Sequence, residues 1–495
     1  MVPKLTAALL LGAGLITAAA PSIPEDDRAA AHVLNRLAYG PRAGDVAAVR
    51  RLGVAAWLEQ QLYPDRIDDR ALEARLAGFT TLTLDARTIV QEFERPAIEE
   101  RRARERAAAP GADAPATAAA ATDTPAAPTA AQANRRRVLD ELAEAKLLRA
   151  VYSERQLEAV LTDAWFNHFN VFAGKGPTRA YVTAYERDAI RPNVLGRFRD
   201  LLGATARHPA MLFYLDNWEN VDPAAGERLS RRAARRAALP GAAEAPTRPP
   251  RGLNENYARE LLELHTLGVD GGYTQADVVA VARAFTGWTM RPRDGSGFRF
   301  VPALHDRGAK TVLGQTLPAG RGIDDGEAVL DLLAAHPATA RRVARMLVTR
   351  VVSDTPPEAL VARAAARFLA TGGDLREVVR VIVTSPEFFA SDAVGTKLKT
   401  PLEFVASALR ASGADVQAAR PLTRILRDLG MPLYFCQPPT GYDDTAATWA
   451  ASGALVSRVN FAADLAAGRV PGLRLPPAFT PDTAATIGAP AFQHR

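Results

Sequence analysis

Apolar residues recur at helical spacing along most of the chain. The clearest stripe runs through Val138, Leu142, Ala145, Leu148 and Tyr152, which is the spacing of one face of a helix. Similar patterns predict further helices, which cover residues 29–62 (as two helices), 154–172, a stretch that ends at 207 and has Pro192 in its first turn, 274–285, 325–352, 360–369, 375–384, 401–409, 421–429 and 452–467. The sequence therefore predicts an all-α fold, a predominantly helical, multi-helix globular body.

Strand-like alternation is confined to one region. Residues 298–302 and 310–317 have good strand patterns and are separated by His305, Asp306, Arg307 and Gly308. Two short strands around a polar segment of this kind are typical of a β-hairpin. We therefore expect one small β-hairpin near residues 298–317.

The densest group of polar side chains on a helical pattern is the stretch 252–269, GLNENYARELLELHTLGV. Asn254 can cap the start of a helix, and Gly268 can end it in the left-handed conformation. The spacing predicts a helix over residues 254–267 that packs against the helix at 154–172. Glu260 and Glu263 fall on its polar side, whereas His265 falls among the apolar positions.

Four clusters of polar side chains are candidates for a functional site. Glu260, Glu263 and His265 are the candidate catalytic residues, and the candidate ligand-binding residues are Asp163, Asn167, His168, Asp216, Asn217, Asn254, Asn256, His305 and Asp306. Solvated helix faces, capped helix ends and buried hydrogen-bond networks are the structural alternatives. Carboxylate, amide and imidazole groups suit a divalent metal, which is the candidate cofactor, although the spacing matches no known metal motif.

Two insertions divide the predicted body. Residues 106–134 consist mainly of Ala, Pro and Thr, a composition that cannot bury enough apolar surface to fold, so we expect disorder. Residues 222–250 are rich in Ala, Arg and Pro and predict a flexible loop with a helical piece near 226–238. This leaves an N-terminal helical region at 25–105, helical cores at 135–221 and 251–470, and a loop-like tail at 471–495.

The first 24 residues have the pattern of a secretory signal peptide. Lys4 precedes an apolar run at 5–16, and small residues follow at 17–20. No other stretch is apolar enough to span a membrane, so we expect an exported protein, either periplasmic or secreted. Cys436 is the only cysteine, which excludes an internal disulfide. The net charge of +6 comes without interleaved aromatic and basic residues, so nucleic acid is not an expected partner.

Several motifs in a fixed order resemble a known family. They are LNRLAYGPRAGDV at 34–46, WFNHFNVF at 165–172, RHPAMLFYLDN at 207–217, LNENYARELLELHTLGVDGGYTQADV at 253–278, AFTGWT at 284–289, HDRGAKTVLG at 305–314 and TSPEFF at 384–389. Together they resemble the large bacterial family known as domain of unknown function 1800. One departure is that the family's Pro-Pro-x-x-x-Gly-Trp stretch here reads Gln437-Pro438-Pro439-Thr440-Gly441-Tyr442.

The resemblance implies an exported, mainly helical protein with no established reaction. It also implies a partner, since members are often encoded beside a second exported family that is similar to sulfatases and alkaline phosphatases. The sequence itself has no Gly-x-Ser-x-Gly elbow, no phosphate-binding loop and no His-Glu-x-x-His motif. Motifs for haem or flavin are also missing, which leaves little support for either cofactor.

Two hypotheses follow. The first is a cell-envelope binding or assembly protein that acts with an exported partner; in it the polar clusters lock helix packing. The second is a metal-assisted hydrolase with an Asp/Asn/Glu/His site between helices. The second hypothesis requires the four clusters to converge, which spacing along the chain does not determine.

Overall fold

The computed structural model describes residues 23–108, 128–237, 252–292 and 294–495, and in this part the chain is predominantly helical, as predicted. Three two-stranded antiparallel sheets are its only strand pairs. The described helices include none with the length and apolar character needed to cross a membrane. Residues 1–22, most of the predicted signal peptide, lie outside the described residues, as do 109–127 and 238–251 of the predicted insertions.

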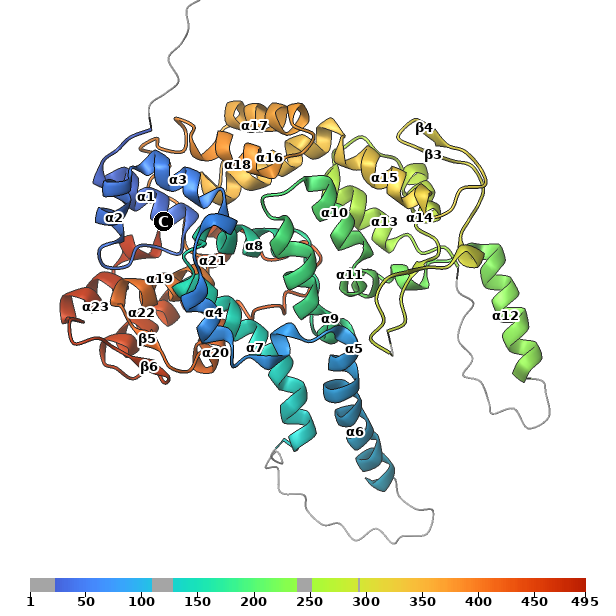
Figure 1. Cartoon of the computed structure of the whole chain (residues 1–495), viewed down its shortest axis with the longest axis horizontal. Coiled ribbons are helices and arrows are strands. Elements are labelled where there is room, and N and C mark those ends of the chain that lie inside the picture. The colour runs from blue at the N-terminus through green and yellow to red at the C-terminus, as the bar shows by residue number, and fades with distance from the viewer. Residues whose placement is uncertain (1–22, 109–127, 238–251, 293) are drawn as a thin grey trace, which may run out of the picture.

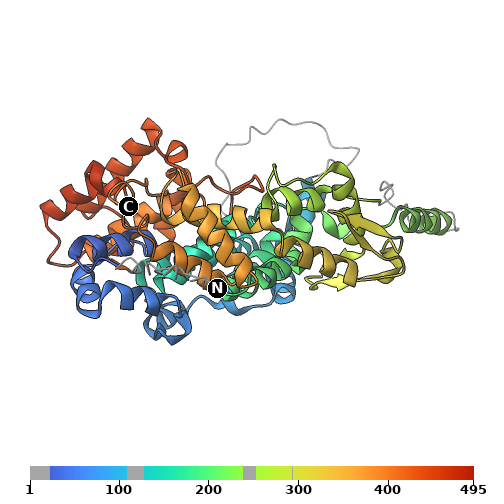
Figure 2. The same ribbon diagram turned by 90° about the horizontal axis from the view of Figure 1, so that it is seen from above.

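The N-terminal part is a series of short helices. They are α1 (Asp27–Leu37), α2 (Asp45–Leu52), α3 (Val54–Gln61), α4 (Arg70–Leu76), α5 (Ala86–Ile89) and α6 (Arg95–Ala108). Asp26 begins the series by accepting a hydrogen bond from the backbone N–H of Ala29 at 2.7 Å, which satisfies an otherwise unpaired donor of the first turn. The first three of these helices lie beside the C-terminal helices at one end of the elongated molecule (Figures 1 and 2), whereas α5 and α6 lie beside α9 (Thr178–Ala184) and α7 (Ala130–Tyr152).

The centre of the fold is formed by the next group of helices. It comprises α7 (Ala130–Tyr152), α8 (Gln156–His168), α9 (Thr178–Ala184), α10 (Phe198–Arg207) and α11 (Pro209–Tyr214), and it is followed by α12 (Pro223–Ala237), which projects from one end of the molecule (Figure 1). The predicted stripe on α7 is buried from Val138 to Leu148, and this helix contacts α4, α6, α8, α9, α19 and α20. The structure corrects one boundary here, because residues 130–134 belong to α7 rather than to a disordered insertion. A capping box of Thr129 and Gln132 starts the helix there.

A helix that ends at Arg207 was also predicted, with Pro192 in its first turn; the end is confirmed but the start is wrong. A π-helical turn at Tyr185–Ile190 and a 3-10 turn at Arg191–Asn193 precede α10, which starts only at Phe198. Pro192 accounts for the break, since it lacks the N–H that a continuous helix requires.

The third group contains the stretch 252–269 and the small sheets. Its elements are α13 (Asn256–Glu260), α14 (Gln275–Ala284), β1 (Trp288–Thr289), β2 (Arg299–Phe300), β3 (Lys310–Val312), β4 (Gln315–Leu317) and α15 (Asp324–Ala334). A small hairpin lies in the predicted region, but the predicted pairing of 298–302 with 310–317 is wrong: β3 pairs with β4 within 310–317, and β2 pairs with β1. Leu313 and Gly314, both with positive φ, make the tight turn, so His305 and Asp306 do not lie at a hairpin tip.

The predicted helix at 254–267 also differs in detail. After α13 the chain makes a π-helical turn at Leu261–Thr266, where the hydroxyl of Thr266 donates to the carbonyl of Leu261, five residues back, at 2.6 Å. Glu255, rather than Asn254, stands at the N-cap position, but the side-chain oxygen of Asn254 does accept from the N–H of Asn256, the first residue of α13, at 3.0 Å. Gly268 ends the segment with φ of +90°, as expected.

The last group packs over the others and returns to the N-terminal end. It comprises α16 (Pro337–Val351), α17 (Glu358–Ala370), α18 (Leu375–Val383), α19 (Pro401–Ser412), β5 (Asp415–Val416), α20 (Arg420–Asp428), α21 (Ala446–Trp449), α22 (Ser452–Ala466), β6 (Leu473–Arg474) and α23 (Pro481–Gly488). α16, α17 and α18 form one layer along the top of Figure 1. The tail was expected to be loop-like, yet it contains β6, which pairs with β5, and α23, which packs on α22.

Candidate functional site

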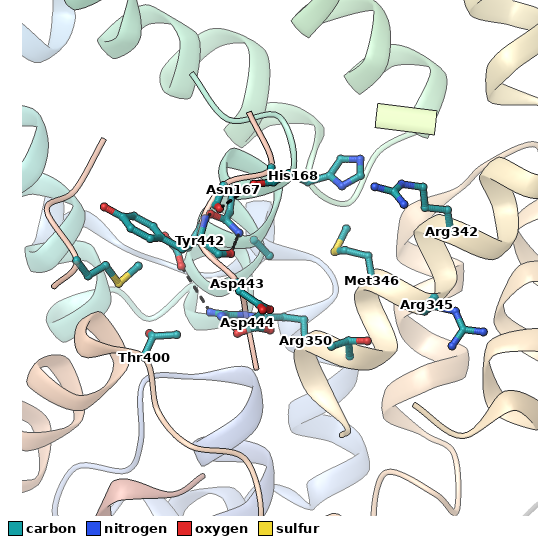
Figure 3. A pocket seen from close by; sticks show the side chains of 16 residues that line it. Asn167, His168, Arg342, Arg345, Met346, Arg350, Thr400, Tyr442, Asp443 and Asp444 are labelled. Carbon is teal, nitrogen blue, oxygen red and sulfur yellow. Dashed lines mark hydrogen bonds and ion pairs between the residues drawn. The ribbon is translucent and has the colours of Figure 1, made fainter. Parts of the chain in front are cut away.

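A cleft of about 550 Å³ opens where the C-terminal end of α8 faces one side of α16 (Figure 3). The segment 440–444 closes a third side. The lining side chains are mainly polar and charged, and those used below are Asp163, Asn167, His168, Arg342, Arg345, Arg350, Tyr442, Asp443 and Asp444. The first predicted cluster, Asp163, Asn167 and His168, therefore lies in this cleft.

His168 is a neutral hydrogen-bond acceptor on the α8 side. Its Nε2 lies 3.1 Å from the backbone carbonyl oxygen of His265. A carbonyl can only accept, so Nε2 carries the hydrogen and Nδ1 keeps a free lone pair. Burial, followed by the charge of Arg342, lowers the pKa of His168 to about 4. Among the described residues Nδ1 has no hydrogen-bond partner, and it is therefore available to a ligand.

Arg342 is the opposing cation on α16 (Figure 3). Its Nε donates to the backbone carbonyl of Leu264 at 2.9 Å, and no carboxylate of the described residues forms an ion pair with it. Burial lowers the pKa of its guanidinium, but an arginine side chain stays charged in proteins. Its terminal nitrogens thus form no ion pair with a carboxylate of the described residues, although the more distant charge of Glu263 raises the pKa and partly offsets the effect of burial.

The backbone of the stretch 252–269 positions both groups. Carbonyl groups in the last turn of a helix lack partners within the helix, and here Leu264 and His265 offer theirs to Arg342 and His168. Contact between this stretch and the end of α8 was predicted, and the rings of Phe169 and His265 do meet at 5.1 Å between centroids. The contribution of this stretch to the cleft is made by main-chain oxygens, which sequence patterns of side chains do not reveal.

The segment 440–444 is fastened to α8 by asparagines. The amide of Asn167 donates to the carbonyl of Tyr442 at 2.6 Å and accepts from the N–H of Tyr442 at 2.7 Å. Asn170 donates to the carbonyls of Cys436 and Pro438 at 3.0 and 2.7 Å. These bonds hold the variant Pro-Pro-Thr-Gly-Tyr loop, which lacks the family's Trp, against the cleft.

Beneath the cleft lies a network of buried charges. Arg350 is its centre, with nitrogens 2.9 Å from Glu403, 2.9 Å from Asp444 and 3.6 Å from Asp163. Arg495 adds a second pair to Glu403 at 3.2 Å. Burial favours the neutral acid, but Arg350 and Arg495 outweigh it and lower the pKa of Glu403 to about 2. The network stays charged at neutral pH.

The network continues on the far side of Asp163. Lys146 lies 3.0 Å from Asp163 and 3.4 Å from Glu186, and Glu186 accepts from the hydroxyl of Tyr434 at 2.6 Å. Burial disfavours a charged lysine, yet the two carboxylates outweigh it and raise the pKa of Lys146. Asp163 is therefore a structural member of this network as well as a lining residue.

The second predicted cluster, Asp216 and Asn217, does not line the cleft; its side chains bond to neighbouring backbone groups and to Lys175. Asn217 donates to the carbonyls of Phe285 and Trp288 at 3.3 and 3.0 Å. Asp216 pairs with Lys175 at 2.8 Å. Asn254 and Asn256, from the third cluster, donate to the carbonyls of Asp216 and Leu215. These contacts lock the turn after α11 to the start of α13.

Glu260 and Glu263 are half-buried but do not line the cleft. Burial and the neighbouring Glu263 raise the pKa of Glu260, and Glu263 accepts from the hydroxyl of Tyr273 at 3.4 Å. His265 is buried, and its Nε2 has no partner among the described residues. Of the three catalytic candidates, only His265 contacts a cleft side chain, and it does so through its carbonyl.

The fourth cluster is a separate buried centre. His305 lies 3.2 Å from Asp325, which also pairs with Lys310 at 2.8 Å. Asp306 pairs with Arg283 at 2.7 Å. The four clusters therefore do not converge on one site. In the part of the chain that the structure describes, no three His, Cys, Asp or Glu side chains are grouped so that they could hold a metal ion.

Sequence reasoning missed Arg342, Arg350, Asp444, Glu403 and Arg495. Arg350 offered a signal, since it shares the apolar face of its helix with Val343 and Leu347. A charge at such a position is usually paired inside the protein. Its partners lie on distant parts of the chain, and spacing could not identify them.

Comparison with known proteins places the whole body of this chain in one family. The family model described as "Protein of unknown function (DUF1800)" matches residues 32–493. No curated protein and no solved structure matches the chain. The match includes α8, α16 and the segment 440–444, and therefore every wall of the cleft. This chain belongs to the DUF1800 family.

Proposed function

We propose that this protein is a binding protein of the cell envelope, whose cleft takes up a small anionic molecule that carries a hydroxyl beside its anionic group. The observation that supports this most is the unpaired guanidinium of Arg342, which faces the neutral ring of His168. Arginine binds carboxylate and phosphate oxygens through two parallel hydrogen bonds. A ligand hydroxyl would donate to the free Nδ1 of His168.

Binding is favoured over catalysis by the state of the imidazole. A general base works best when its pKa lies near the working pH. With a pKa of about 4, His168 accepts hydrogen bonds well but takes up a proton weakly. The metal-assisted hydrolase hypothesis lacks an assembled ligand set among the described residues.

The cellular setting belongs to the proposal too. The pattern of residues 1–24 favours export to the periplasm or beyond. The family resemblance favours an exported sulfatase- or phosphatase-like partner, and a bound anion is the kind of molecule that such an enzyme releases. The cleft would then capture product or deliver substrate.

The test is a binding screen on the full chain with hydroxy acids, sugar phosphates and the corresponding neutral sugars. We expect saturable binding of at least one hydroxylated anion and none of its neutral counterpart. Arg342→Met should weaken binding at least about tenfold, the loss that a charge-assisted hydrogen bond accounts for, and His168→Phe should weaken it by about three- to tenfold, as expected for a neutral hydrogen bond. Arg341→Met is the matched control, because Arg341 is exposed on the same helix and pairs with Glu358. Binding that survives Arg342→Met unchanged, or a neutral sugar that binds equally well, would refute the proposal.

A further inference from the structure

The helix α12 (Pro223–Ala237) extends away from the body at the end of the molecule opposite the termini of the fold (Figures 1 and 2). Only its first turn is packed, where Ala225 and Gly226 are buried. Asp222 anchors that turn, since its N–H donates to the carbonyl of Leu304 at 2.8 Å and its carboxylate accepts from the N–H groups of Ala224 and Ala225. The rest of the helix is presented to the surroundings.

The exposed part of α12 has a basic stripe, which consists of Arg228, Arg231, Arg232 and Arg235. Their i, i+3, i+4, i+7 spacing places all four within an arc of roughly 100° of the helix surface. The side chains of Arg228 and Arg231 are 65% and 76% exposed. Arg228 lies 3.9 Å from Asp222 and Arg231 pairs with Glu227, whereas Arg232 and Arg235 have no carboxylate partner among the described residues.

We infer that the basic stripe of α12 binds the surface of a membrane that contains anionic phospholipids. Arginine forks match phosphate oxygens, and a row of basic side chains is attracted to a negatively charged membrane surface. A protein partner would need buried aromatic or aliphatic anchors, but Leu229, 44% exposed, is the only large apolar side chain on the described part of this helix. The stripe therefore lies on headgroups and does not insert.

A second projecting helix, α6, also carries four exposed arginines but has a different charge pattern from α12. α6 carries Arg101, Arg102, Arg104 and Arg106 in its exposed part. Three glutamates, Glu99, Glu100 and Glu105, are interleaved with them, and Arg104 and Arg101 pair with two of these at 2.9 and 3.4 Å. α6 therefore presents mixed charges, whereas the described exposed side chains of α12 include four arginines against one glutamate, Glu227. The inference on α12 is independent of the cleft and its ligand.

The experiment is co-sedimentation of the full chain with vesicles of phosphatidylcholine alone and of phosphatidylcholine with phosphatidylglycerol. The quantity compared is the gain, which is the fraction bound to vesicles with phosphatidylglycerol minus the fraction bound to phosphatidylcholine alone. This difference removes any binding through apolar segments, which does not depend on the charge of the lipid. We expect this gain to be large at low ionic strength and to disappear at about 1 M salt, where charges are screened within roughly 3 Å.

A variant with Arg228, Arg231, Arg232 and Arg235 all changed to Gln should lower the gain at least about tenfold. The matched control changes Arg101, Arg102, Arg104 and Arg106 to Gln and removes the same charge from α6; it should retain the gain within about twofold. The inference is overturned if the wild type shows no gain, if the α12 variant keeps it, or if both variants lose it equally. Melting curves of both variants confirm that the body is folded.

Discussion

A side-chain carbon at Gly441 would lie 2.4 Å from the backbone carbonyl oxygen of Asn167. Gly441 also has φ of +73°, a conformation that costs other L-residues roughly 1–2 kcal/mol. The close approach is what allows the side chain of Asn167 to bond both backbone groups of Tyr442. The wall of the cleft formed by the segment 440–444 thus requires a glycine at position 441.

Gly441→Ala should therefore lower the free energy of unfolding by more than the backbone conformation alone explains. Gly430→Ala is the control, since Gly430 has φ of +90° but no atom within 4 Å of the added carbon, so it should lose only roughly 1–2 kcal/mol. We expect the Gly441 variant to lose more, and to exchange the amide hydrogens around Tyr442 faster. Equal losses in urea denaturation would show that the contact with Asn167 carries no constraint.

Glu403→Gln tests the buried charge network. The change keeps the shape of the side chain but leaves Arg350 and Arg495 without their shared carboxylate. Breaking a buried pair on one side typically costs about 3–5 kcal/mol, which we expect in chemical denaturation. Glu358→Gln, which removes an exposed carboxylate paired with Arg341 and Arg345, should leave the midpoint unchanged. A neutral effect of Glu403→Gln would mean that the network does not stabilise the fold.

The pH dependence of stability should show a contribution from His32. Burial, followed by the charge of Arg36, lowers the pKa of His32 from 6.5 to about 3, so the folded protein binds fewer protons than the unfolded chain between these values. The contribution of His32 to stability is thus complete above pH 6.5 and is lost as the pH falls below it. Well below pH 6.5 the loss approaches about 1.4 kcal/mol per pH unit.

The measurement is the unfolding free energy of the wild type and of His32→Gln at pH 7, 6 and 5. Other titrating groups are common to both proteins and cancel in the difference. The wild type should lose about 1 kcal/mol more than the variant between pH 6 and 5. Parallel curves would show that His32 is protonated equally in the folded and unfolded chains.

Cys436 reports on the loop that borders the cleft. Burial raises the pKa of its thiol to about 11, and the thiolate is the reactive form, so labelling by iodoacetamide at pH 8 should be slow in the native protein. Asn170→Ala removes the hydrogen bonds to the carbonyls of Cys436 and Pro438. Labelling should then accelerate severalfold, while Asn460→Ala, an exposed change on α22, should have no effect.

Much of the fold could be predicted because helix signals are local. The stripe on α7, the helix that starts near residue 274 and the end at Gly268 all appear in the structure. Each depends on residues within one or two turns of one another. The π-helical turns and the true strand pairing were missed, since they depend on contacts with distant segments such as β1 with β2.

Of the walls of the cleft, only the one formed by α8 could be predicted from the sequence. Asn167 and His168 stood out as polar groups beside aromatic residues on α8. Arg342 is separated from His168 by more than 170 residues of chain, and nothing in its own helix distinguishes it from the other arginines. What distinguishes Arg342 is a missing carboxylate partner and the carbonyl of Leu264. Both are properties of the folded chain.

The charge network under the cleft also has a consequence for the order of folding. Lys146 and Asp163 lie in the first half of the chain, whereas Glu403, Asp444 and Arg495 lie hundreds of residues further on. Until these distant segments meet, several of these charges lack their final partners. Desolvating them unpaired is costly, so we expect the centre of the body to close in one step with the docking of the segments that carry Glu403, Asp444 and Arg495.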